Sequence, residues 1–102
     1  MSKYHVIQTI RSELDIIEGA AWYEMQRVGL GDEFFLCIDA ELSFIKRDPL
    51  VYSEKINKIR RALVNRFPYA IFYLVKESTI IILAVIHFKR DPVSWPIIKS
   101  ND

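Results

Sequence analysis

The sequence predicts an α+β fold in the order β-α-α-β-β-β: a short strand, a two-helix antiparallel hairpin and a three-stranded antiparallel meander. Three observations support this prediction. Apolar residues recur at spacings of three and four through the first half, β-branched runs follow Pro49, and short turns separate successive elements. The 102 residues are few enough for one domain, residues 1–102, to contain them all.

The first strand is expected at residues 4–9, and the first helix is expected to begin at Ser12. Serine is a residue type that caps helix N-termini, and Glu13 and Asp15 follow in the first turn, where the helix dipole favours anions. Apolar residues then recur at helical spacing, at Leu14, Ile17, Ala21, Met25 and Val28. We expect this stripe to face the core.

The second helix is predicted over residues 32–46, after a tight turn that contains Gly29 and Gly31. Its apolar stripe consists of Phe34, Ile38, Leu42 and Ile45, widened by Phe35 and Cys37. Lys46 lies at its C-terminal end, where cations are favoured, and Pro49 follows as a stop signal. A short turn between two helices predicts an antiparallel hairpin.

Three strands are predicted in the second half, at residues 59–64, 67–75 and 79–88. Pro68 stands at the beginning of the middle strand, where a missing N–H group is tolerated. The turns are short, which favours an antiparallel meander. From residue 89 onward the sequence is expected to be irregular, because its prolines disfavour a long helix.

Both faces of this sheet are expected to be apolar, because side chains alternate across a strand. In the middle strand the two sets are Tyr69, Ile71, Tyr73 and Val75 against Ala70, Phe72 and Leu74. In the last strand they are Ile81, Leu83, Val85 and His87 against Ile80, Ile82, Ala84 and Ile86. A helix pair covers one face, so the C-terminal tail, a second copy or a partner protein is expected on the other.

The charge is divided unevenly between the two halves. Residues 1–45 carry three basic and eight acidic side chains, and residues 46–102 carry eleven basic and five acidic ones. This asymmetry fits an anionic partner for the second half, or simple attraction between the halves. The single cysteine, Cys37, excludes an intrachain disulfide and is expected to be a buried thiol. No apolar run approaches the length of a membrane helix, so a soluble cytoplasmic protein is expected.

Three stretches resemble the RelE/ParE superfamily, the toxins of type II toxin–antitoxin pairs, which includes plasmid stabilisation proteins. They read AAWYEMQRVGLGDEFF, IRRALVNRFPYAIFYLV and ILAVIHFKRDPVSW, and the resemblance extends over nearly the whole chain in the right order. It implies a bacterial growth inhibitor that a cognate antitoxin, a separate chain, neutralises by laying helices or a strand across it. A homodimer or a heterotetramer with the antitoxin is also compatible with it.

The superfamily divides into RelE-like members, which cut messenger RNA on the ribosome, and ParE-like members, which inhibit DNA gyrase. Arg90 matches a late arginine of the RelE-like nucleases, but Trp95 stands in the tail where those nucleases carry a tyrosine. The pI of about 7.9 is also low for a ribosome binder. The resemblance therefore favours the ParE-like branch, with a metal-independent RelE-like endoribonuclease and a non-toxic antitoxin-binding scaffold as alternatives.

The residues expected to act fall into three groups. If the protein is a nuclease, the catalytic residues are Arg61, His87 and Arg90. The residues expected to bind the target, gyrase or ribosome, are Arg60, Arg66, Lys89, Asp91 and Trp95. Those expected to contact the antitoxin are Tyr69, Ile71 and Tyr73. Arg60 and Arg61 are adjacent on a strand, so at most one of them joins any single site.

No cofactor or metal is expected. The two histidines lie far apart in the sequence and no cysteine pair exists, so no metal-ligand spacing is present. The GLG turn is too short for a phosphate-binding loop and follows a helix rather than a strand. For His87, a structural hydrogen bond at the end of a strand is favoured over a catalytic role.

Overall fold

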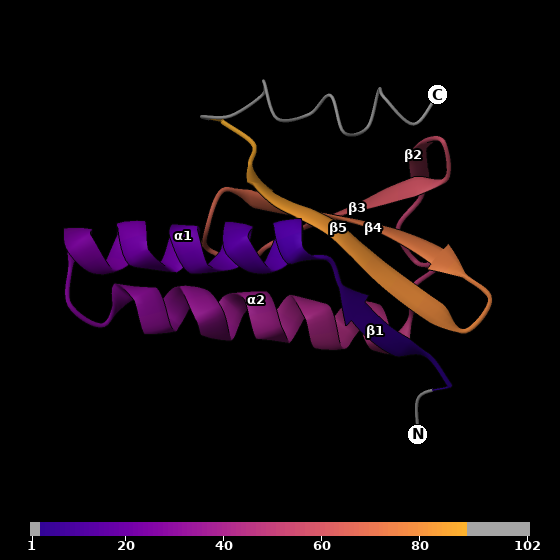
Figure 1. Cartoon of the computed structure of the whole chain (residues 1–102), viewed down its shortest axis with the longest axis horizontal. Helices are drawn as coiled ribbons and strands as arrows, with labels where there is room; N and C mark the ends of the chain where they lie inside the picture. The colour runs from indigo at the N-terminus through magenta and orange to yellow at the C-terminus, as the bar shows by residue number, and fades with distance from the viewer. Residues whose placement is uncertain (1–2, 90–102) are drawn as a thin grey trace.

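The computed structural model describes residues 3–89, which form two helices and five strands (Figure 1). In chain order these are β1 (His5–Gln8), α1 (Ile10–Gln26), α2 (Leu30–Arg47), β2 (Glu54–Ile56), β3 (Ile59–Leu63), β4 (Tyr69–Lys76) and β5 (Thr79–His87). The predicted order of strand, helical hairpin and meander is confirmed. The three-residue strand β2 was not predicted, because so short and polar a segment has no alternating pattern.

The sheet has the strand order β1-β5-β4-β3-β2. Strand β1 is parallel to β5, with Val6 opposite Ile80, whereas the other neighbouring pairs are antiparallel. Within residues 3–89, the first strand therefore pairs with the last one. Asn57 and Lys58 join β2 to β3, and both have positive φ angles, 51° and 66°. A two-residue type I′ hairpin turn requires positive φ at both positions.

Helix α1 begins three residues earlier than expected, because its N-cap is Thr9 rather than Ser12. The Thr9 hydroxyl accepts the backbone N–H of Ser12 at 3.1 Å. The Ser12 side chain is buried, and its hydroxyl donates to the Thr9 carbonyl at 2.9 Å. Both residue types cap helices, so the sequence alone did not distinguish between them.

The prediction of the buried face of α1 was wrong. The buried positions are Ser12, Ile16, Gly19, Ala20 and Tyr23. The expected stripe lies on the outside, where Leu14 is 50% exposed, Ile17 56% and Met25 83%. Small residues on the inner face let α1 approach its neighbours closely. Because small side chains contribute little hydrophobicity, the apolar periodicity of the sequence does not reveal this face.

Helix α2 agrees better with its prediction. Phe34, Ile38 and Ile45 are buried, and Leu42 is partly buried against the same core. Phe35 was expected to widen this stripe, but it is 41% exposed. Cys37 is only partly buried.

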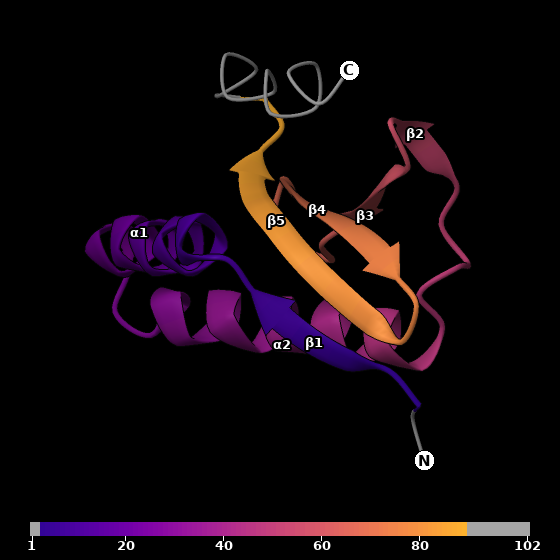
Figure 2. The ribbon, with the colours of Figure 1, turned by 45° about the vertical axis from the view of Figure 1, so that its right-hand side comes forward.

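The two helices pack on one face of the sheet (Figure 2). The alternation predicted for β4 is confirmed: Tyr69, Ile71, Tyr73 and Val75 lie on the helix side, and Ala70, Phe72 and Leu74 lie on the second face. On that second face Ile59, Ala70, Phe72 and Ala84 have no exposed area within this single chain. A second copy or a partner is therefore not required to bury them.

A bulge in β5 changes the alternation predicted for that strand. Between β4 and β5, Phe72 pairs with Ala84 and the next residue, Tyr73, pairs with Ile82. Leu83 is therefore the extra residue of the bulge. Before the bulge Ile80 and Ile82 face the helices, and after it Val85 faces them, while Ala84 and Ile86 lie on the second face. His87 pairs with Tyr69 and so also lies on the helix side.

Tyr73 lies fully buried in this core, and its hydroxyl donates to the Pro49 carbonyl at 2.8 Å. Burial raises the pKa of Tyr73 to about 12. Because the folded state holds this proton more tightly than the unfolded state, its stabilising effect is complete below about pH 10 and is lost towards pH 12. Between about pH 10 and pH 12 the free energy of unfolding of the parent protein should fall. We expect this fall to be roughly 2 kcal/mol smaller in the Tyr73→Phe variant, which lacks the ionisable hydroxyl.

Urea denaturation at several pH values between 8 and about 12 would measure this effect. The ionisation of lysines is common to both proteins and cancels in the comparison. An equally steep fall in the Tyr73→Phe variant would contradict the assignment.

Within residues 3–89, neither helix combines the length and the apolar character that crossing a membrane requires.

Candidate functional site

A pocket of about 310 Å³ lies between α1 and the C-terminal half of β5. Its walls combine carboxylates, aromatic rings and one guanidinium group. They are formed by Arg11, Asp15, Glu18, Gly19, Trp22, Tyr69, Val85, Ile86 and His87. We call it the α1–β5 pocket.

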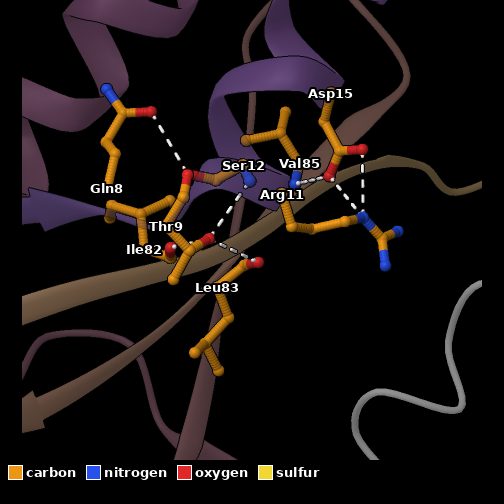
Figure 3. Close-up of polar contacts among 8 residues, drawn as sticks. All are labelled: Gln8, Thr9, Arg11, Ser12, Asp15, Ile82, Leu83 and Val85. Carbon is orange, nitrogen blue, oxygen red and sulfur yellow. Dashed lines mark hydrogen bonds and ion pairs between the residues drawn. The ribbon is translucent and has the colours of Figure 1, made fainter.

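The pocket exists because β1 is shorter than β5. In the described part of the chain β1 pairs with β5 only as far as Ile82. The chain then turns into α1, and the Thr9 hydroxyl lies 2.9 Å from the Ile82 carbonyl oxygen and 3.1 Å from that of Leu83 (Figure 3). The side chain of the N-cap residue thus takes the place of a neighbouring strand at these two carbonyl groups.

Asp15 continues this replacement one turn further along α1. Its Oδ2 accepts the backbone N–H of Val85 at 2.9 Å, and Arg11 Nε donates to both carboxylate oxygens at 3.1 Å (Figure 3). The bulge at Leu83 accounts for this contact, because it changes which β5 backbone groups point towards α1. Asp15 therefore joins α1 to β5 at the floor of the pocket.

We expect Asp15→Ala to lower the unfolding free energy by about 1–3 kcal/mol, because it leaves the part-buried Val85 N–H without its acceptor. Glu13→Ala, an exposed change in the same helical turn, is the matched control and should cost less. Chemical denaturation of both variants measures the difference. Equal losses would indicate that the Asp15 contact contributes nothing specific.

His87 forms one side of the pocket beside Tyr69. The two rings meet edge to face, with centroids 5.2 Å apart. His87 Nδ1 accepts the backbone N–H of Lys89 at 3.1 Å, so Nδ1 carries no proton in this arrangement. The structural hydrogen bond favoured from the sequence is present, and it fixes the direction of the chain as it leaves β5.

Arg61 lies on the opposite face of the sheet from His87. It pairs with Phe72, on the second face, whereas His87 pairs with Tyr69, on the helix side. The structure therefore does not bring Arg61 and His87 into one catalytic site. Cross-strand register decides this point, and it cannot be obtained from the alternation within a single strand.

Arg61 instead lines a pocket of about 250 Å³ with Tyr52, Ser53, Lys55 and Leu63. Tyr52 donates to Glu41 Oε2 at 2.8 Å. Burial and this carboxylate raise the pKa of Tyr52 to about 12. Tyr52 thus keeps its proton near neutral pH and is a poor general base.

Arg60 and Arg66 are already engaged within the chain. Arg60 donates to the Tyr52 carbonyl and forms an ion pair with Glu54 at 3.4 Å, with a largely covered side chain. Arg66 pairs with Glu33 at 2.7 Å, and this contact lowers the pKa of the Glu33 carboxyl. As predicted, Arg60 and Arg61 point to opposite faces. Among Arg60, Arg61 and Arg66, only Arg66 has a mostly exposed side chain.

The three residues expected to contact an antitoxin lie inside the protein. Ile71 and Tyr73 have no exposed area, and Tyr69 is 6% exposed at the edge of the α1–β5 pocket. The reason is the side on which the helices pack: they cover the face that these residues share. In this conformation a separate chain cannot touch Ile71 or Tyr73, and we correct the prediction for these two.

Three further predicted residues, Arg90, Asp91 and Trp95, lie outside the described residues. Lys89 is described and exposed. Within residues 3–89 no group of three histidine, cysteine, aspartate or glutamate side chains is placed to hold a metal ion.

Sequence reasoning missed the residues that build the α1–β5 pocket, above all Thr9, Asp15 and Trp22. Asp15 was interpreted only as a favourable charge in the first turn of a helix. The signal that points to it is a polar pair flanking the strand-to-helix junction, where a short strand leaves part of its neighbour unpaired.

Comparison with known proteins supports the fold. No protein-family model matches this sequence, and a search of curated proteins finds no match either. Among solved structures, a chain of the "Chromosomal ParDE TA system from P. aeruginosa" superposes with a TM-score of 0.62. The match covers 81% of this chain and 94% of that one, at 15% sequence identity. The chain has a ParE-like fold. The ParE-like fold expected from the sequence is thereby confirmed, at an identity that supports the fold and not a shared activity.

Proposed function

We propose that this protein is the toxin of a type II toxin–antitoxin pair, of the ParE-like branch, and that it inhibits DNA gyrase in the bacterial cytoplasm. The observation that carries the proposal is the ParE-like fold, because the similarity covers 94% of the chain from the ParDE system. The stretches RFPYAIFY and HFKRDPVSW support it independently. A cognate antitoxin, a separate chain, holds the toxin inactive.

The placement of Arg61 counts against the nuclease site expected from the sequence. A metal-independent nuclease needs a proton acceptor and a cation on the same phosphate. Arg61 and His87 lie on opposite faces, and Tyr52 beside Arg61 holds its proton. We propose that Lys89, Arg90, Asp91 and Trp95 carry the contact with the target, as a protein-binding segment and not as a catalytic site.

Expression of the chain without its antitoxin is expected to arrest growth, and co-expression of the antitoxin, sought in the neighbouring reading frame, should restore it. The readout is the viable count after induction. Soluble, folded protein together with normal growth would contradict the proposal and favour a non-toxic antitoxin-binding scaffold.

Two assays on purified protein identify the target. Supercoiling by gyrase should be inhibited, while messenger RNA on translating ribosomes stays intact. Trp95→Ala is expected to lose the inhibition, and Leu50→Ala, at an exposed apolar side chain outside the α1–β5 pocket, serves as the control that keeps it. Cleaved RNA with normal supercoiling would overturn the gyrase proposal in favour of a RelE-like nuclease.

A further inference from the structure

The outer side of α1 carries a continuous line of exposed apolar side chains. Ile10 is 76% exposed, Leu14 50%, Ile17 56% and Met25 83%. Together with Ala21 they follow one another at steps of three and four residues. Successive residues of a helix are about 100° apart, so these side chains all point to one side. The buried positions of α1 lie on the opposite side. We call this line the α1 stripe.

Scattered exposed apolar residues are ordinary, but this arrangement is not scattered. Steps of three and four residues keep these side chains on one side of the helix, as in the apolar faces by which helices pack against a neighbour. The α1 stripe makes no contribution to the core, which the other side of the helix supplies. Its pattern is therefore that of a surface for a second helix.

The charges beside the stripe indicate which helix fits. Exposed Glu13 and Glu18 border it on its two sides. The cation of α1, Arg11, is already paired with Asp15 at 3.1 Å. Two copies of α1 packed together would bring these carboxylates close to one another, which is unfavourable. A helix with lysine or arginine beside its apolar residues would instead meet charges of the opposite sign.

The α1–β5 pocket opens on the flank of α1 next to the stripe. Glu18 and Trp22 belong to α1 and line this pocket with Tyr69 and His87. Arg11 also lines the pocket, but its charge is already paired with a carboxylate. Aromatic rings beside the carboxylate of Glu18 are surroundings that favour a lysine or arginine side chain. The pocket volume of about 310 Å³ leaves room for one such side chain.

We propose that a partner chain docks an amphipathic helix along the α1 stripe, with basic residues on both edges and one of them in the α1–β5 pocket. The proposal rests on the apolar line, the carboxylates and the pocket, and it does not depend on the chain being toxic. It goes beyond the proposed function by stating the chemistry of the partner surface.

The test uses two synthetic helical peptides of about three heptads with the same leucine and isoleucine positions. One carries lysine and arginine at the flanking positions, and the other carries glutamate there. Isothermal titration of the full chain should show the basic peptide binding at least about tenfold more tightly, a difference of about 1.4 kcal/mol. Equal affinities for the two peptides would overturn the proposal.

Variants locate the binding surface. Leu14→Gln combined with Ile17→Gln should abolish binding of the basic peptide, whereas Leu50→Gln, at an equally exposed leucine off the stripe, should not. Glu13→Lys combined with Glu18→Lys should reverse the preference between the peptides. Circular dichroism shows whether each variant is folded.

Sedimentation of the chain alone separates this proposal from self-association. A monomer is expected at all concentrations. A dimer that the Leu14 and Ile17 changes dissociate would mean that a second copy occupies the stripe, and would overturn the proposal. Neither result bears on growth arrest or supercoiling, so the two proposals fail separately.

Discussion

Replacing Phe34 by alanine is expected to lower the free energy of unfolding by about 3–5 kcal/mol. Phe34 has no exposed area and stands at the centre of an aromatic cluster. Its ring lies 5.3 Å from that of Tyr23, 5.3 Å from that of Phe67 and 4.9 Å from that of Tyr69. The change leaves a cavity at the point where α1, α2 and β4 meet.

The loss is large because the surrounding rings cannot move in to fill the space. Tyr69 is held by its strand, and Tyr23 by its helix. Small proteins have a total stability of about 5–15 kcal/mol, so a loss of this size removes a large part of it.

Phe35→Ala is the matched control. The neighbouring phenylalanine is 41% exposed, and its removal should cost about 1 kcal/mol or less. Urea denaturation of both variants gives the comparison through the shift in midpoint at constant slope. Similar losses for the two variants would mean that the aromatic cluster is not the centre of the core.

Replacing Gly31 by alanine is expected to destabilise the protein by about 1–3 kcal/mol, although glycine to alanine usually stabilises a helix. An added Cβ at Gly31 would lie 2.7 Å from the Ala20 carbonyl oxygen and 3.0 Å from Glu24 Oε1. The first of these is a backbone atom of α1, so the two helices would have to separate. Glu24 would also be disturbed, and it accepts the N–H groups of Gly29 and Gly31.

Ser43→Ala, an exposed position in the same helix, is the control and is expected to change stability by a few tenths of a kcal/mol at most. Thermal unfolding should place the two variants clearly apart. A Gly31→Ala protein as stable as the parent would show that the helices separate without cost.

The two helices show what the sequence could and could not predict about the fold. The inner face of α2 consists of large apolar residues such as Phe34 and Ile38, so periodicity found it. The inner face of α1 adds only Ile16 and Tyr23 to the small residues Gly19 and Ala20, and a longer line of large apolar residues lies outside. Periodicity locates an apolar stripe but does not say whether the stripe faces the core or a partner.

The site was harder to predict for a different reason. Tyr69 and His87 could be placed at the ends of their strands, but the relation between Arg61 and His87 depends on register across three strands. The bulge at Leu83 adds a change of alternation that Ile81 to Ile86, all apolar, cannot reveal. Where both faces of a strand are apolar, a shift of one residue has no signature in the sequence.

The pairing of the first strand with the last has a consequence for the synthesis of the chain. The Thr9 hydroxyl reaches the Leu83 carbonyl, 74 residues later in the sequence. Contacts of such separation form late and slow the folding of small proteins. The α1–β5 pocket needs both α1 and β5, so a nascent chain on the ribosome lacks the pocket, and whatever activity depends on it, until β5 has been synthesised.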